Sequence, residues 1–151
     1  MKRRRPSSPL KKPGEISTIA ELLPAVVHWN RDHIGHLAGR PLDDPRTIVV
    51  EKDFYAVVKE SPGVFDVVLN DVDNGPDGCV LDRNERLYRR GGLAAIRRCL
   101  RPGGVLAVWC VEDDSRLVKA MTDAGFRAHA ETIHARNVPR GHRHTVFIGR
   151  V

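Results

Sequence analysis

Short apolar runs alternate along this chain with segments in which apolar residues recur at helical spacing. The runs are rich in Val and Ile and fall at residues 16–20, 47–50, 65–69 and 105–111. Apolar runs this short predict strands that are buried on both faces. The helical spacing falls at residues 25–37, 53–60, 84–100 and 113–124. Two closing segments, 126–135 and 145–151, predict strands that we expect to be antiparallel because only a loop joins them.

This alternation of strands and helices predicts an α/β fold built on a mostly parallel sheet. With 151 residues, the chain is long enough for one domain with a substantial core. We expect that domain to span residues 15–151. Residues 1–14 differ in composition, because they contain six Lys and Arg, no acid, and several Pro and Ser. This composition predicts a disordered basic leader.

The leader accounts for the net charge of +6, because the other 19 Lys and Arg equal the 19 Asp and Glu in number. A neutral body does not support a face for nucleic acid. The leader could contact RNA or DNA without sequence specificity, and a solvated leader without function is the simpler interpretation. No segment approaches the roughly 18 consecutive apolar residues of a membrane span. We therefore expect a cytoplasmic protein that does not contact a membrane.

Acidic residues follow three of the predicted strands. Glu21 follows the first, Asp53 comes shortly after the second, and Asp71 and Asp73 come after the third. Ligands of open parallel sheets bind just outside the carboxyl ends of the strands, so these acids form the candidate site. Glu21 could accept hydrogen bonds from the ribose hydroxyls of a nucleotide, and Asp53 from an adenine amino group. Taken singly, each could equally be an exposed or helix-capping residue.

Metal and thiol chemistry are the other candidates. Residues 71–75 depart from a calcium-binding loop because their Gly comes one position early. His33 and His36 have helical spacing, but no further ligand completes a zinc site, so we expect no metal. Cys79 lies near the acidic loop without a neighbouring base in the sequence to activate it. Three Cys without a CxxC pair predict reduced thiols.

Two tryptophans and two histidines receive structural interpretations. Trp29 and Trp109 are expected in the core, because aromatic residues are too scarce for a surface that stacks nucleic-acid bases. His142 and His144, which flank Arg143, are expected at a solvated basic edge beside the last strand.

Four segments in order resemble a known family. They are Ala20-Glu-Leu-Leu-Pro-Ala-Val-Val27, Asp53 after a short strand, the run from Phe65 through Pro76, and Leu100-Arg-Pro-Gly-Gly-Val-Leu-Ala-Val108. Together with Asn84-Glu-Arg-Leu-Tyr88, they resemble the catalytic domain of spermidine synthase-like proteins, the polyamine aminopropyltransferases. The resemblance implies the Rossmann-like fold of class I S-adenosylmethionine-dependent methyltransferases.

The resemblance also implies a role for each acid. Glu21 would hold the ribose, and Asp53 the adenine, of decarboxylated S-adenosylmethionine or S-adenosylmethionine bound as co-substrate. Asp71 would be the catalytic residue that accepts a proton from the attacking amine, and Asp73 would help to bind the diamine. Family members usually have Asp-Ser-(Ser/Thr)-Asp here, so the second carboxylate comes one position early in this chain. The implied partner is a small-molecule amine, and assembly of the chain into a homo-oligomer stays open.

The family domain begins with a strand and a Gly-rich loop that have no counterpart before Ile16. By resemblance, that strand lies between the strands that end at Glu21 and Asp71. We therefore expect a sheet that is incomplete at its N-terminal strand. Three functions stay open: aminopropyl transfer to a polyamine, methyl transfer in a relative that uses S-adenosylmethionine, and a catalytically inactive remnant of the fold.

Overall fold

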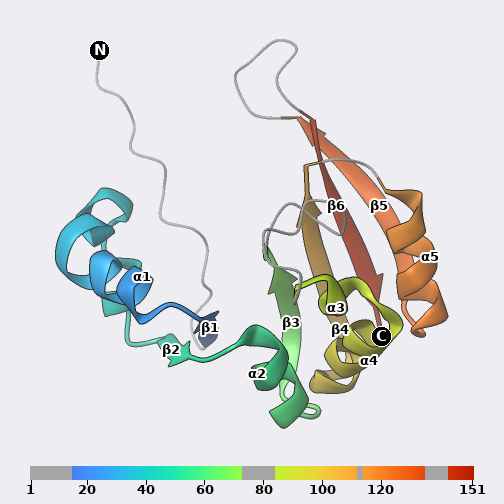
Figure 1. The fold of residues 1–151 in the computed structure, drawn as a ribbon, viewed down its shortest axis with the longest axis horizontal. Helices are drawn as coiled ribbons and strands as arrows, with labels where there is room; N and C mark the ends of the chain where they lie inside the picture. The colour runs from blue at the N-terminus through green and yellow to red at the C-terminus, as the bar shows by residue number, and fades with distance from the viewer. Residues whose placement is uncertain (1–14, 73–83, 112–113, 135–142) are drawn as a thin grey trace. The chain divides into compact units, whose positions relative to one another are not determined.

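The computed structural model of this chain describes residues 15–72, 84–111, 114–134 and 143–151, so the predicted leader lies outside the described residues. Its strands form two sheets (Figure 1). The first contains β1 (Ser17–Glu21) and β2 (Thr47–Glu51). The second has the strand order β3 (Phe65–Asn70), β4 (Leu100–Cys110), β6 (Arg143–Arg150), β5 (Arg127–His134). The chain divides into two compact units between Phe54 and Tyr55, and each unit contains one sheet.

In the first unit, β1 and β2 are parallel, and Glu21 lies opposite Glu51. Several short helical segments connect them: α1 (Pro24–Trp29), a π-helical turn (Asn30–Ile34) and two 3-10 turns (Gly35–Ala38 and Pro41–Asp43). The single helix predicted over 25–37 is therefore broken. Gly35 marks the break, because a Cβ there would lie 2.0 Å from the carbonyl oxygen of Asn30.

The prediction of a core position for Trp29 is wrong, because this residue is 54% exposed. Val27 is the buried residue of α1. A residue two positions further along a helix points about 200° away around the helix axis. Burial of Val27 therefore turns Trp29 outward.

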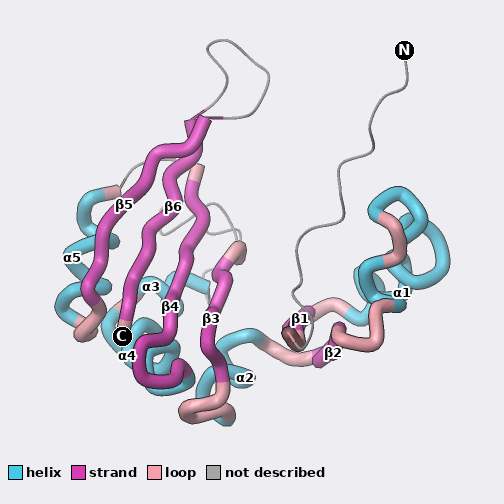
Figure 2. Tube along the Cα trace, turned by 180° about the vertical axis from the view of Figure 1, so that it is seen from behind, coloured by secondary structure: helices cyan, strands magenta, loops and turns pink. Residues whose placement is uncertain are grey.

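In the second unit, helices cover one face of a mixed sheet. β3 and β4 are parallel, whereas β6 is antiparallel to both β4 and β5. The described residues of this part of the chain contain the helices α2 (Phe54–Glu60), which begins at the boundary between the units, α3 (Glu85–Tyr88), α4 (Arg90–Cys99) and α5 (Ser115–Asp123). α4 and α5 lie on the same face of the sheet (Figures 1 and 2). The predicted α/β class and the antiparallel closing strands are confirmed.

The core of this unit consists of alternate strand residues and the inner faces of α4 and α5. Its largest fully buried apolar side chains in these elements are Leu93, Ile96, Leu106, Val108, Leu117, Met121 and Phe147. Burial of each such side chain contributes about 1.5–3 kcal/mol to folding. Side chains alternate between the two faces of a strand, so every second residue of β4 and β6 points into this core.

The opposite face of the sheet, turned toward the viewer in Figure 2, is not covered by any described helix of this unit. Val67 is 53% exposed and Leu69 is 73% exposed on this face. The prediction that this strand is buried on both faces is therefore wrong for β3. An apolar run shows that both faces of a strand can be buried. Whether a face is buried depends on another element that packs against it. Val105 and Ala107 of β4 lie opposite Val67 and Leu69. Residues on the same face of β4 and β6 extend the apolar surface: Trp109, Val146 and Ile148.

Among the described strands, no hydrogen-bonded pairing joins β1 or β2 to β3. The parallel pairs β1-β2 and β3-β4 and the antiparallel pairings of β6 agree with the expected Rossmann-like class with antiparallel closing strands. The expected incompleteness at the N-terminal strand stays a prediction, because residues 1–14 lie outside the described residues.

The helix predicted over 84–100 is divided at Arg89, whose backbone is extended (φ −81°, ψ 161°). Gly92 allows α3 and α4 to approach each other closely. A Cβ at Gly92 would lie 2.1 Å from the carbonyl oxygen of Arg86 and 2.7 Å from the Cα of Leu87. No larger residue fits at this position unless the backbone of α3 moves.

Gly92→Ala should therefore lower the free energy of unfolding by about 1–3 kcal/mol. Gly91→Ala is the matched control, because a Cβ there would meet nothing within 4 Å. Since Ala favours helix over Gly, this control should be as stable as the wild type or more stable by up to about 1 kcal/mol. Urea unfolding followed by circular dichroism measures both variants. Equal stability of the two would contradict the close approach of α3 and α4.

Candidate functional site

Asp71 directly follows β3, at the carboxyl end of the parallel β3-β4 pair. Leu69, two residues earlier, lies opposite Ala107 of β4. Side chains alternate between the two faces of a strand, so Asp71 continues the face on which Leu69 is exposed. The structure thus places an exposed carboxylate at the edge of the sheet where ligands of parallel sheets bind.

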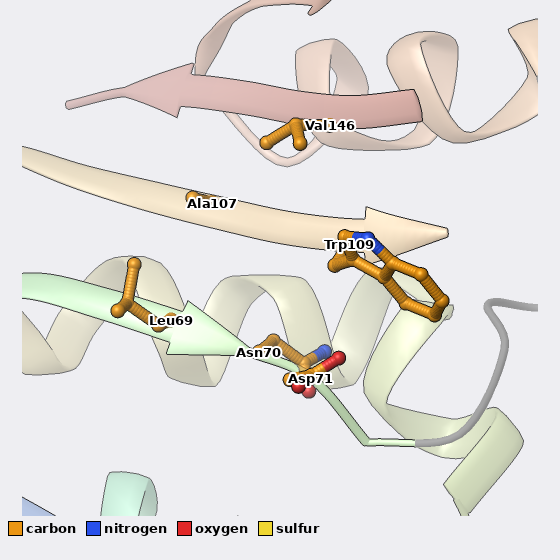
Figure 3. Close-up of a pocket in the computed structure, with 6 residues that line it drawn as sticks. All are labelled: Leu69, Asn70, Asp71, Ala107, Trp109 and Val146. Atoms are coloured by element: carbon orange, nitrogen blue, oxygen red, sulfur yellow. The ribbon is translucent and has the colours of Figure 1, made fainter. Parts of the chain in front are cut away.

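An open hollow of about 470 Å³ lies beside Asp71 (Figure 3). Its lining comes from three strand ends and consists of Leu69, Asn70, Asp71, Ala107, Trp109 and Val146. Asp71 is the acid of this set, and most of the other side chains are apolar. A carboxylate attracts a cation, apolar walls contact methylene groups, and an indole face attracts positive charge. The hollow therefore suits a cation with an apolar body.

The indole of Trp109 lies against the imidazole of His144. Their ring centroids are 5.1 Å apart, and the ring planes are tilted by 33°. The Nδ1 atom of His144 is buried and has no hydrogen-bond partner. Both residues are half-buried, so neither the core position expected for Trp109 nor the solvated edge expected for His144 is correct. His142 lies outside the described residues. The strand register pairs Trp109 with Val146, and His144 lies two residues before Val146 on the same strand. Only this register reveals that the two rings meet.

The turn after β3 is held by two buried side chains that sequence reasoning did not single out. The Oδ1 atom of Asn70 accepts a hydrogen bond from the backbone N–H of Val72 at 3.4 Å. The hydroxyl of Tyr88 donates to the carbonyl oxygen of Val72 at 2.5 Å. Asn70 is 1% exposed, and its Nδ2 atom has no hydrogen-bond partner. The sequence signal that was available is a polar residue at the end of an apolar run.

The two acids proposed for the nucleoside lie in the first unit. Glu21 ends β1, and Asp53 comes two residues after the end of β2. Because these strands are parallel, the structure brings both acids to the carboxyl edge of one sheet. One carboxylate oxygen of Glu21 accepts a hydrogen bond from the backbone N–H of Leu23 at 2.8 Å. Asp71 directly follows a strand of the other sheet, and Asp73 lies outside the described residues.

Within the described ranges, no group of three or more His, Cys, Asp or Glu side chains is placed to hold a metal ion. In the helical segment that raised the zinc alternative, His28 pairs with Asp32 at 2.6 Å and lies edge-on to His33 at a centroid distance of 5.6 Å. None of the helices in the described part of the chain has the length and apolar character needed to cross a membrane.

Residues 11–123 match the family model of the spermine/spermidine synthase domain. The chain belongs to this family. It is 34% identical over 91 residues to polyamine aminopropyltransferase 2 of Pseudomonas aeruginosa, in an alignment that covers 58% of this chain. That alignment covers 24% of the Pseudomonas protein, so the chain spans about a quarter of the length of this relative.

Solved structures show the same fold at low sequence identity. Spermidine synthase from Thermotoga maritima is similar with a TM-score of 0.66 and 16% identity, covering 90% of this chain and 45% of that protein. A methyltransferase from Burkholderia thailandensis, solved with 1,6-didemethyltoxoflavin and S-adenosylhomocysteine, has a TM-score of 0.51 and 18% identity, covering 88% of this chain and 60% of that protein. The resemblance to the family and to the methyltransferase fold is therefore confirmed.

The structure also indicates how the described thiols behave. Cys99 and Cys110 are buried, and this burial raises the pKa of each thiol to about 11. Both are therefore protonated at neutral pH, where the thiolate is the reactive form. Cys79 lies outside the described residues.

In a Cys79→Ser chain, we expect a disulfide reagent to react with Cys99 and Cys110 only after denaturant is added. The absorbance of the coloured thiol that the reagent releases measures the reaction over time. The reaction of the same protein in denaturant gives the reference rate. Reaction of either thiol at this reference rate in the folded chain would show that the burial seen here is wrong.

Proposed function

We propose that this chain binds an S-adenosyl nucleoside and transfers an aminopropyl group from decarboxylated S-adenosylmethionine to the amine of a polyamine. One observation carries the proposal: Asp71 lies at the carboxyl end of β3, at an apolar hollow, in a chain of the spermine/spermidine synthase family. The curated relative from Pseudomonas aeruginosa is named for this reaction.

The chemistry explains why a carboxylate is needed. The lone pair of a neutral amine forms a bond to the methylene carbon next to the sulfonium. The C–S bond breaks, its electron pair stays on sulfur, and neutral methylthioadenosine leaves. The nitrogen then carries one proton too many, which the carboxylate of Asp71 accepts as general base.

The hollow supports a polyamine as acceptor. Leu69, Trp109 and Val146 line it with apolar surface that suits the methylene groups of an aliphatic amine. The indole of Trp109 also attracts an ammonium group through its π face. We propose that Asp73, which follows Asp71 by two residues, binds a second amino group. A carboxylate attracts an ammonium group strongly wherever water is partly excluded.

The nucleoside is proposed to bind at the carboxyl edge of the β1-β2 sheet. The carboxylate of Glu21 would accept hydrogen bonds from ribose hydroxyls, and Asp53 would accept one from the adenine amino group. Their common edge in a parallel strand pair supports this assignment. The hydrogen bond from Leu23 to one oxygen of Glu21 helps to orient its carboxylate.

A nucleoside-binding module without transfer is the second candidate. The first unit by itself favours it, because Glu21 and Asp53, the two acids proposed for the nucleoside, lie at the carboxyl edge of one parallel strand pair. Methyl transfer to an amine would use the same residues with S-adenosylmethionine as donor.

Calorimetric titration with methylthioadenosine tests the nucleoside site. Glu21→Ala and Asp53→Ala should each weaken binding about tenfold or more, because each removes a hydrogen bond to a charged group. Glu51→Ala is the matched control, since Glu51 lies opposite Glu21 at the same strand end. Its affinity should stay near that of the wild type. Unchanged affinity in both Glu21→Ala and Asp53→Ala would refute the nucleoside site.

Asp71→Asn tests the transfer step while keeping the shape of the side chain. We expect turnover to fall by about 10²–10⁴-fold, because the amide cannot accept the proton, while the affinity for methylthioadenosine stays unchanged. Asp66→Asn serves as control, since Asp66 is an exposed acid of the same strand that pairs with Arg101. Chromatographic measurement of methylthioadenosine released from decarboxylated S-adenosylmethionine and putrescine gives the rates. Full turnover in Asp71→Asn would exclude Asp71 as the base; nucleoside binding without turnover in the wild type would favour the second candidate.

A further inference from the structure

The peptide groups on both sides of Val72 are held by side chains rather than by a strand or helix. Asn70 accepts from the N–H of Val72, and Tyr88 of α3 donates to its carbonyl oxygen. Both side chains are buried, with Asn70 1% and Tyr88 5% exposed. Val72 follows Asp71 directly, so the backbone course after β3 depends on these two contacts.

Asp71 itself has no comparable support. Within the described part of the chain, its carboxylate makes no hydrogen bond, and its side chain is exposed. Its direction must therefore come from the backbone, which sets where the Cα–Cβ bond points. The backbone before Asp71 belongs to β3, and the backbone after it is held by Asn70 and Tyr88. A functional side chain needs such support to keep one productive geometry.

Asn70 also carries a cost that a purely structural residue would avoid. Its Nδ2 group is buried without an acceptor, which destabilises the folded state. Apolar residues occupy the two preceding positions of β3, Val68 and Leu69. A leucine at position 70 would remove the unpaired donor and would also remove the acceptor for Val72. An apolar residue at position 70 would therefore favour stability, whereas asparagine is needed to hold the turn.

We infer that Asn70 and Tyr88 are positioning residues, which hold the backbone of Val72 and thereby aim the carboxylate of Asp71. The inference rests on the proposed function, in which Asp71 binds and deprotonates the amine. It identifies two residues whose effect on transfer passes through the backbone rather than through contact with substrate.

The experiment compares Asn70→Leu and Tyr88→Phe with the control Tyr55→Phe. Tyr55 is the other tyrosine of the chain, and its ring lies beside the side chains of Lys59 and Arg86. We expect kcat to fall about tenfold or more in both test variants, with the affinity for methylthioadenosine within about twofold of the wild type. Asn70→Leu should keep or raise the melting temperature while it loses turnover. Tyr55→Phe should keep the kcat of the wild type.

A second readout is independent of turnover. Three-bond HN–Hα couplings of Val72, measured by NMR, show whether the backbone after Asp71 keeps one φ angle. We expect one φ angle in the wild type and in Tyr55→Phe, and averaged couplings in Asn70→Leu and Tyr88→Phe. Unchanged couplings in both test variants, or averaging already in the wild type, would overturn the inference. A wild type without turnover would contradict the proposed function instead, and the couplings would still decide the role of Asn70 and Tyr88.

Discussion

The parallel pairing of β3 with β4 is the interaction on which the candidate site depends. It brings the carboxyl ends of two strands to one edge, where Asp71 follows β3 and Trp109 lies near the end of β4. The antiparallel pairing of β6 with β4 then adds Val146 and His144 to the same region. Three strands far apart in sequence thus meet at one hollow because of strand direction and register.

Helices pack on only one face of this sheet, and this explains why the hollow on the other face is open and apolar. Helices α4 and α5 bury one set of strand residues and provide the core that stabilises the unit. The opposite set, which includes Leu69 and Trp109, forms an apolar surface next to a carboxylate. The same apolar composition therefore stabilises the unit on one face and offers a binding surface on the other.

The turn after β3 shows how stability and function diverge. Tyr88 reaches Val72 from a helix that the close approach at Gly92 holds against α4. Asn70 leaves a buried donor unpaired while it serves the same turn. The unpaired donor of Asn70 lowers stability, and it lies beside the acid to which the chemistry is assigned.

The sequence by itself determined the α/β class, most strand positions, the placement of Asp71 after a strand, and membership of the family. These follow from local periodicity and from motifs, which short stretches of chain carry. Only the tertiary structure decided that Leu69 is exposed, that Trp109 meets His144, and that Tyr88 holds Val72. Those outcomes depend on strand register and on which elements cover which face, and such contacts join residues that are distant in sequence.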